Sequence, residues 1–223
     1  MYWALAAGVV GAAAWSWWAF DTAPYPYAQR RLLDLPLPFL TQRRLEDLLG
    51  LAPGERVLEI GPGTGLQALP VARRLGGSGR LDIVDIQQEM LDHVMRRAAG
   101  LGLGNIVATR ADAQRLPFDA DSFDAAYLVT ALGEIPRPEL AVTELARVLK
   151  PGGRLVVGEF FDRHQVRRGA LARYADDAGL RVERVIGPPF AYYARLGRPP
   201  SPRVVRPAGW SVRGAPGSSP SGR

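Results

Sequence analysis

Between residues 51 and 196 the chain alternates short apolar runs with amphipathic stretches of helical period. This alternation is typical of βα units, which assemble into a mostly parallel sheet with helices on both faces. We therefore expect an α/β fold with seven strands. The predicted strands are 56–60, 80–84, 106–109, 123–129, 154–160, 181–186 and 190–195. The predicted helices are 65–75 with a kink at Pro70, 87–99, 138–149 and 165–178.

The chain opens with a hydrophobic segment, residues 1–20, that carries no charged side chain. As one helix it would span about 30 Å, the thickness of a bilayer core. No basic residue precedes it, and tryptophans stand where a signal peptide would be cleaved, so we expect an uncleaved membrane anchor. The Arg residues that follow favour a cytoplasmic domain on the membrane. A helix that docks on the domain, or lies in the interface, is the alternative.

Residues 21–50 are predicted to form an amphipathic linker and helix. Thr41 is expected to cap a short helix, 42–49, because threonine side chains accept hydrogen bonds from the first free amides of a helix. Three leucines share one face of this helix, which predicts that it packs against the domain. They are Leu45, Leu48 and Leu49.

Most of the net positive charge of the chain lies in its last 27 residues. Residues 197–223 hold five Arg and no acid, and 16 of these 27 residues are Pro, Gly or Ser. We expect a disordered basic tail, since such a segment cannot bury enough apolar surface to order itself. Residues 51–196 carry 19 basic against 18 acidic side chains, so no nucleic-acid partner is expected. The absence of Cys and the presence of only two His disfavour a metal site.

A glycine-rich turn, Glu59-Ile-Gly61-Pro-Gly63-Thr64-Gly65, follows the first predicted strand. Glycines there let the backbone approach a nucleotide-like ligand at the start of a helix. The second strand ends in Asp85, where a carboxylate can accept hydrogen bonds from both hydroxyls of a ribose. The alternative for Asp85 is a helix cap. Leu66 follows where a dinucleotide fingerprint would continue, which disfavours NAD.

Four further motifs follow in order: Arg110-Ala-Asp112-Ala113, Leu116-Pro-Phe118, Ser122-Phe-Asp124 and Leu149-Lys-Pro-Gly-Gly-Arg154. Together with the glycine turn they resemble the class I S-adenosylmethionine-dependent methyltransferases, especially the group that includes quinone-biosynthesis C-methyltransferases. The resemblance covers about residues 51–199 and implies a Rossmann-like fold. Three further stretches resemble a group of small bacterial methyltransferases of unassigned substrate. These are Tyr25-Pro-Tyr27, Leu132-Gly-Glu-Ile-Pro136 and Phe190-Ala-Tyr-Tyr193.

The resemblance implies S-adenosylmethionine as the cofactor and assigns residues to its parts. The methionine moiety would lie against Glu59, Gly61, Gly63, Thr64 and Gly65. Asp85 would hold the ribose and Ile86 the adenine face, Asp112 and the Ala113 backbone would hold the adenine edge, and Thr130 would line the methyl-transfer pocket. A turn-stabilising contact is the alternative for Asp112. Residues 150–153 are explained by a turn that opens the fifth predicted strand, without any role in binding.

The expected activity is methyl transfer to an apolar or amphipathic small molecule, such as a lipid, a quinone precursor or a hydrophobic metabolite. A phenol or enol acceptor needs a base within hydrogen-bond reach. The weak candidates are Glu134, Tyr127, Glu159 and His164. The alternatives are a non-catalytic binding module and, less favoured, a nucleic-acid methyltransferase. The sequence leaves the oligomeric state open.

Overall fold

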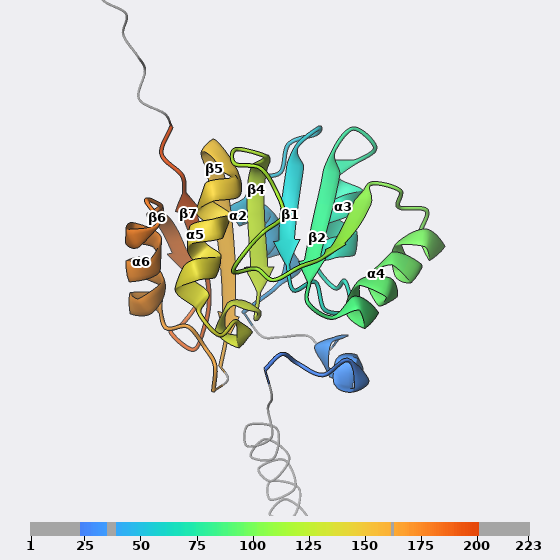
Figure 1. The fold of residues 1–223 in the computed structure, drawn as a ribbon, viewed down its shortest axis with the longest axis horizontal. Helices are drawn as coiled ribbons and strands as arrows, with labels where there is room; N and C mark the ends of the chain where they lie inside the picture. Colours follow the sequence, from blue (N-terminus) through green and yellow to red (C-terminus); the bar gives the residue numbers. More distant parts are fainter. Residues whose placement is uncertain (1–22, 35–38, 162, 201–223) are drawn as a thin grey trace, which may run out of the picture.

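The computed structural model describes residues 23–34, 39–161 and 163–200 (Figure 1). Their strands form one sheet in the order β3-β2-β1-β4-β5-β7-β6. The first five strands run parallel, and β7 is antiparallel to both of its neighbours. The strands are β1 (Arg56–Ile60), β2 (Arg80–Asp85), β3 (Ile106–Arg110), β4 (Phe123–Val129), β5 (Leu149–Phe160), β6 (Arg181–Ile186) and β7 (Ala191–Gly197). The predicted seven-stranded, mostly parallel α/β fold is confirmed.

Helices cover both faces of this sheet (Figure 1). They are η1 (Tyr27–Asp34), α2 (Gln42–Leu49), α3 (Ala68–Leu75), α4 (Gln88–Gly100), η2 (Leu132–Glu134), α5 (Pro138–Val148) and α6 (Arg168–Asp177). The apolar side chains of α2, α3 and α4 form a core with one face, and those of α5 and α6 form a second core with the other. Strand β1 is therefore buried along nearly its whole length, as expected of a central parallel strand.

Two predicted helix starts are wrong by three residues. Helix α3 begins at Ala68 rather than Gly65, because the glycine turn continues through residue 67. Pro70 consequently lies in the first turn of α3, where its missing N–H has no partner to lose, so the expected kink has no physical cause. Helix α6 begins at Arg168 rather than residue 165.

The ordered domain extends past the predicted boundary at residue 196. Strand β7 runs to Gly197, and the N–H of Arg198 donates to the carbonyl of Gly153 at 2.8 Å. The N–H of Gly152 donates in return to the carbonyl of Arg198 at 3.0 Å. The first residues of the predicted tail thus continue the antiparallel pairing of β7 with β5.

The predicted anchor, residues 1–20, and most of the predicted tail lie outside the described residues. Among the helices that the structure describes, none is both long enough and apolar enough to cross a bilayer.

The prediction for α2 is confirmed in detail. Thr41 Oγ1 accepts a hydrogen bond from the N–H of Arg44 at 3.4 Å, and the three leucines of its apolar face are buried. This face lies in the same core as α3 and α4. Although α2 precedes the first strand, it is therefore an integral part of the domain.

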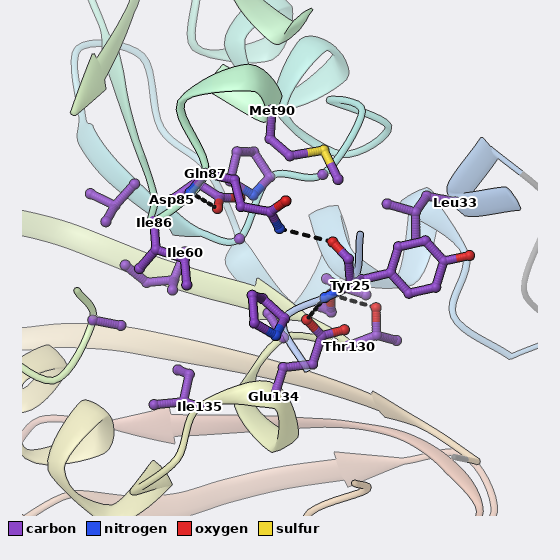
Figure 2. Close-up of a pocket in the computed structure, with 18 of the residues that line it drawn as sticks. Tyr25, Leu33, Ile60, Asp85, Ile86, Gln87, Met90, Thr130, Glu134 and Ile135 are labelled. Carbon is purple, nitrogen blue, oxygen red and sulfur yellow. Dashed lines mark hydrogen bonds between the residues drawn. The ribbon is translucent and has the colours of Figure 1, made fainter. Parts of the chain in front are cut away.

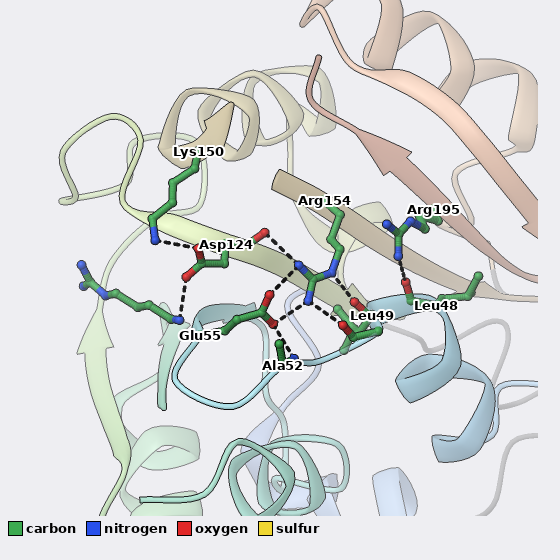
Figure 3. Close-up of polar contacts among 10 residues, drawn as sticks. Leu48, Leu49, Ala52, Glu55, Asp124, Lys150, Arg154 and Arg195 are labelled. Carbon is green, nitrogen blue, oxygen red and sulfur yellow. Dashed lines mark hydrogen bonds and ion pairs between the residues drawn. The ribbon is translucent and has the colours of Figure 1, made fainter. Parts of the chain in front are cut away.

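Two arginines fix the end of α2 to the sheet (Figure 3). Arg154 on β5 donates to the carbonyls of Leu49 and Gly50 and pairs with both carboxylate oxygens of Glu55, at 2.9 and 2.6 Å. Arg195 on β7 donates to the carbonyl of Leu48 at 2.5 Å. The last carbonyls of a helix have no partner within the helix, so these guanidinium groups satisfy them and hold α2 in place.

Replacing Arg154 by Met should lower the free energy of unfolding by about 3 kcal/mol, because it leaves the largely buried Glu55 and two helix carbonyls without their partner. Urea denaturation measures this change. Arg181→Met, at an exposed position on β6, is the matched control and should change stability by less than about 0.5 kcal/mol. Equal losses for the two variants would contradict the anchoring role of Arg154.

Candidate active site

The loops that follow the parallel strands enclose a cavity of about 760 Å³ at the carboxyl edge of the sheet (Figure 2). The chain leaves β1 toward β2 on one side and leaves β4 toward β5 on the other. This divergence is a topological switch point, the usual ligand site of open α/β sheets. The cavity is lined by residues after β1, β2, β3 and β4 and by the segment before α2.

The glycine turn after β1 forms the floor of the cavity. Gly61, Gly63 and Gly65 have φ values of 66°, 53° and 86°, which side chains with a Cβ rarely adopt. A Cβ on Gly61 would lie 2.7 Å from the Cβ of Ala131, and one on Gly63 would lie 3.2 Å from Cδ1 of Leu33. Gly61 is therefore required where the β1 and β4 loops meet, and Gly63 where the N-terminal segment crosses the turn. Gly61, Gly63 and Thr64 line the cavity.

Asp85 ends β2 and lines the cavity next to Ile86. Its Oδ1 accepts the N–H of Gln87 at 2.8 Å (Figure 2). Burial raises the pKa of its carboxyl, against the lowering effect of hydrogen bonds from the Gln87 and Ile86 amides. The side chain thus stabilises the turn that leads into α4 while it faces the cavity.

Asp112 follows β3 and lines the cavity together with Ala113. Its Oδ1 accepts the backbone N–H of Gln114 at 2.8 Å, and both of its oxygens accept from the Gln114 side-chain amide. The turn contact that the sequence offered as an alternative is therefore present. It orients the carboxylate at the cavity wall.

Thr130 follows β4 and lines the cavity with a φ of 55°. A β-branched residue with positive φ is strained, and such residues cluster at functional sites. Its N–H donates to the carbonyl of Gly158 at 2.7 Å, and its hydroxyl donates to the carbonyl of Val129 at 2.8 Å. These bonds hold the strained conformation where β4 turns away from β1.

Glu59 is buried in β1, directly before the glycine turn, and is not among the residues that line the cavity. The hydroxyl of Tyr127, on the neighbouring β4, donates to Glu59 Oε2 at 2.8 Å. Burial raises the pKa of the Glu59 carboxyl to about 8. The hydrogen bond from Tyr127 lowers this pKa, but by less than burial raises it. Burial and the nearby Glu59 also raise the pKa of Tyr127. The pair is a support beneath the turn rather than part of the cavity wall.

The base candidates differ in their positions. Glu134 lines the cavity, and its Oε2 accepts the backbone N–H of Tyr25 at 2.9 Å (Figure 2). Glu159 is buried and accepts the N–H of Val166 at 3.0 Å. The backbone carbonyl of His164 packs so closely on Gly133 that a Cβ there would collide with it. Of the four candidates, Glu134 is the one whose residue forms part of the cavity wall.

An N-terminal strap, residues 23–34, covers the cavity, and the sequence did not assign it to the site. Gln87 Nε2 donates to the carbonyl of Tyr25 at 2.8 Å, and the hydroxyl of Thr64 donates to Asp34 at 2.7 Å. Pro24, Tyr25, Leu32 and Leu33 contribute to the lining. The motif Tyr25-Pro-Tyr27 indicated related proteins, but nothing in its local pattern indicates a contact with Gln87 or Glu134.

The chain is similar to known methyltransferases. Residues 57–153 match the family described as "Methyltransferase domain". The chain is 40% identical over 139 residues to a ubiquinone/menaquinone biosynthesis C-methyltransferase of Cellvibrio japonicus, with 62% of this chain and 55% of the relative covered. It is also 40% identical over 115 residues to that of Teredinibacter turnerae, with 51% and 46% covered. The chain spans about half the length of these curated relatives.

Residues 57–153 form a methyltransferase domain of the S-adenosylmethionine-dependent class. Its fold is similar to that of an S-adenosylmethionine-dependent methyltransferase from Aquifex aeolicus, with a TM-score of 0.72, 22% identity and coverage of 78% of this chain and 99% of the other. Geranyl diphosphate C-methyltransferase from Streptomyces coelicolor has a TM-score of 0.61 and 18% identity, with coverage of 70% and 78%.

The cofactor of the methyltransferase domain is S-adenosylmethionine, and the residues of the site fit it. No Lys or Arg in the described part of the chain forms an ion pair with Asp85 or Asp112. Unpaired carboxylates favour a cationic ligand with hydroxyl and amine donors and disfavour a pyrophosphate. The cavity volume lies in the range of small-molecule sites, about 300–1,000 Å³.

Gly61→Ala should disrupt the site beyond its effect on backbone strain. Gly102 is the control, because its φ of 67° matches the 66° of Gly61 and a Cβ there would meet no described atom within 4 Å. Gly102→Ala should cost about 1 kcal/mol of stability. Gly61→Ala should cost about 1–3 kcal/mol more, because its Cβ must displace the β4 loop, and it should weaken S-adenosylmethionine binding. Denaturation and calorimetry measure these effects, and equal losses in both variants would refute the close-approach argument.

Glu59→Gln should change how stability depends on pH. Because the pKa of Glu59 rises from its ordinary value of 4.5 to about 8 on folding, its stabilising neutral form is fully present below pH 4.5 and lost as pH rises through 8. Between pH 4.5 and 8 the free energy of unfolding of the wild type should therefore fall by up to about 1.4 kcal/mol per pH unit through Glu59.

The Gln variant lacks this loss, so its stability relative to wild type should rise between pH 5 and 8. Urea denaturation at several pH values measures the difference. Glu89→Gln, at an exposed position on α4, should follow the wild-type profile. Parallel profiles for wild type and Glu59→Gln would show that Glu59 does not keep a raised pKa.

Proposed function

We propose that this protein transfers the methyl group of S-adenosylmethionine to an apolar or amphipathic small molecule, with a quinone precursor as the favoured acceptor. The observation that carries the proposal is the composition of the cavity wall. Asp85 and Asp112 line it at the loops after β2 and β3, Glu134 lines it after β4, and apolar side chains of the strap and the strand ends line much of the rest. The printed activity of the relatives, ubiquinone/menaquinone biosynthesis C-methylation, supports an acceptor of this kind.

The part of the wall that carries Asp85 and Asp112 would hold the cofactor. Asp85 would accept hydrogen bonds from the ribose hydroxyls, and Ile86, which is half exposed at the wall, would cover the adenine. Asp112 and the backbone of Ala113 would contact the adenine edge. The backbone of the glycine turn, including Thr64, would surround the methionine part, with Glu59 supporting the turn from below. When bound, S-adenosylmethionine supplies a methyl group on a sulfonium sulfur, which leaves as a neutral thioether.

The apolar part of the wall would hold the acceptor and exclude water from it. Leu32, Leu33, Leu40, Ile135 and Phe160 contribute here. Such walls align an acceptor by shape, and alignment supplies most of what methyl transfer requires of the protein. A hydrogen-bonded carboxylate at this wall would suit removal of the proton that a phenol or enol acceptor loses. We assign this role to Glu134.

The proposed location is the cytoplasmic face of a membrane, with residues 1–20 as the anchor. This assignment rests on the uncharged length of the segment and on the Arg residues that follow it. Tethering would keep the cavity close to a bilayer in which an apolar acceptor dissolves.

Calorimetry with S-adenosylmethionine tests the cofactor site. Wild type should bind with measurable heat, and Asp85→Ala should bind at least about tenfold more weakly, since a hydrogen bond to a charged group is worth about 1.5–3 kcal/mol. Asp92→Ala, on the outer part of α4, is the matched control and should bind like wild type. No heat with wild type would favour a scaffold without a cofactor site.

Label transfer tests the acceptor class. The protein, incubated with methyl-labelled S-adenosylmethionine, should label a lipid-soluble extract and leave protein and RNA fractions unlabelled. Glu134→Gln should reduce this transfer while leaving the heat of cofactor binding in place, because Glu134 lies on the acceptor side. Labelling of RNA or protein would overturn the proposed acceptor, and binding without any transfer would favour the non-catalytic binding module.

A further inference from the structure

Large apolar side chains are exposed around the mouth of the cavity. Of the ten large hydrophobic residues that the described part of the chain exposes, six lie at the carboxyl edge of the sheet or on the strap. Leu66 and Ile86 are two of these and belong to the cavity wall. The other four define what we call the apolar rim: Phe39, Phe161 and Phe190, together with Leu32 of the strap, which also lines the cavity.

Two members of the rim contact each other, and the other two lie among or next to the residues that line the cavity. The rings of Phe39 and Phe190 meet edge to face with centroids 5.8 Å apart. Phe161 follows Phe160, which lines the cavity and pairs with Ala191, the neighbour of Phe190. Leu32 lines the cavity itself. The rim is therefore a continuation of the apolar cavity wall onto the outer surface.

Exposure of these side chains is high. Phe161 is 58% exposed, Phe190 48% and Phe39 41%. Contiguous exposed apolar surface is uncommon on soluble domains and marks a site where another apolar phase is contacted. We therefore expect these three phenylalanines to bind an apolar partner.

The course of the chain indicates which occupant. The uncharged stretch of residues 1–20 ends three residues before Ala23, and Pro24 and Tyr25 already line the cavity. The segment that has the length and composition to enter a bilayer thus joins the domain at the edge that bears the rim. A bilayer held by this segment would lie next to the rim rather than next to the opposite edge of the sheet.

Two chain segments that carry rim residues are rich in arginine, which suits an anionic lipid surface. Residues 23–44 hold four Arg against one Asp, and residues 161–168 hold three Arg against one Asp. Basic residues that flank an apolar face favour binding to anionic headgroups. A protein partner with an apolar patch would not need this basic border.

We propose that the apolar rim inserts into the membrane surface, so that the cavity opens directly onto the lipid phase. The inference rests on the proposed function in one respect, since a lipid-dissolved acceptor would then enter without crossing water. The partner is the acyl-headgroup boundary of a bilayer that contains anionic lipid.

The absence of cysteine in the chain permits a direct test. Single-cysteine variants of the full chain, Phe161→Cys and Phe190→Cys, are labelled with an environment-sensitive fluorophore and reconstituted in phosphatidylcholine–phosphatidylglycerol vesicles that contain nitroxide lipid. Leu101→Cys is the matched control, because Leu101 is 51% exposed but precedes β3 at the opposite edge of the sheet. An unchanged thermal midpoint confirms that each labelled variant is folded.

Both rim labels should shift their emission to the blue and lose most of their fluorescence to the nitroxide lipid, whereas the label at 101 should keep its own. Equal quenching at the rim and at 101, or none at either, would overturn the proposal. Rim labels that are shielded from aqueous iodide but not quenched by nitroxide lipid would also overturn it, because a protein surface would then cover the rim.

The outcome is independent of the catalytic proposal. If rim labels are quenched but calorimetry shows no cofactor binding, the proposed function fails and the membrane surface stands. If the cofactor binds and label transfer occurs but the rim stays in water, the rim proposal fails alone.

Discussion

The structure depends on the close approach of two loops at the carboxyl edge of the sheet. The chain leaves the adjacent parallel strands β1 and β4 in opposite directions, and the loops meet where residue 61 has no room for a Cβ. Gly61 makes this possible, because a Cβ there would collide with Ala131. Thr130, at the same divergence, has a left-handed conformation. The space that opens between the loops is the cavity, so the strain and the site have a common origin.

Buried polar groups beneath this divergence form a hydrogen bond with each other. Glu59 and Tyr127 form a buried hydrogen-bonded pair across β1 and β4, which joins the strands just below the turn. Burial raises the pKa of the Glu59 carboxyl to about 8 in spite of this bond. Above the turn, Asp85 and Asp112 each use a backbone amide two residues ahead to fix their orientation. Rigid carboxylates without cationic partners suit a site that awaits a positive ligand.

The sequence predicts the sheet well because its strands are short runs of apolar and β-branched residues bounded by clear turns. The bounds of β1, β4 and β6 agree with the predicted ranges. The errors lie at element ends. Helix α3 begins three residues later than predicted because the glycine turn continues to residue 67. Strand β7 ends later than predicted because Gly197 pairs with Arg154 of β5. Asp85 was identifiable as a cavity residue because it ends a predicted strand, and Asp112 because its motif resembles that of a known family. The strap was not, since Tyr25 reaches Gln87 and Glu134 across 62 and 109 residues of chain.

The crossing of Tyr25 over the cavity also bears on the timing of turnover. Its carbonyl is held by the loop after β2 and its amide by the loop after β4, so one short segment bridges the two halves of the sheet. A molecule bound beneath this crossing lies against a segment whose position depends on these two bonds. We therefore expect the opening of the strap to influence how long a bound molecule stays in the cavity.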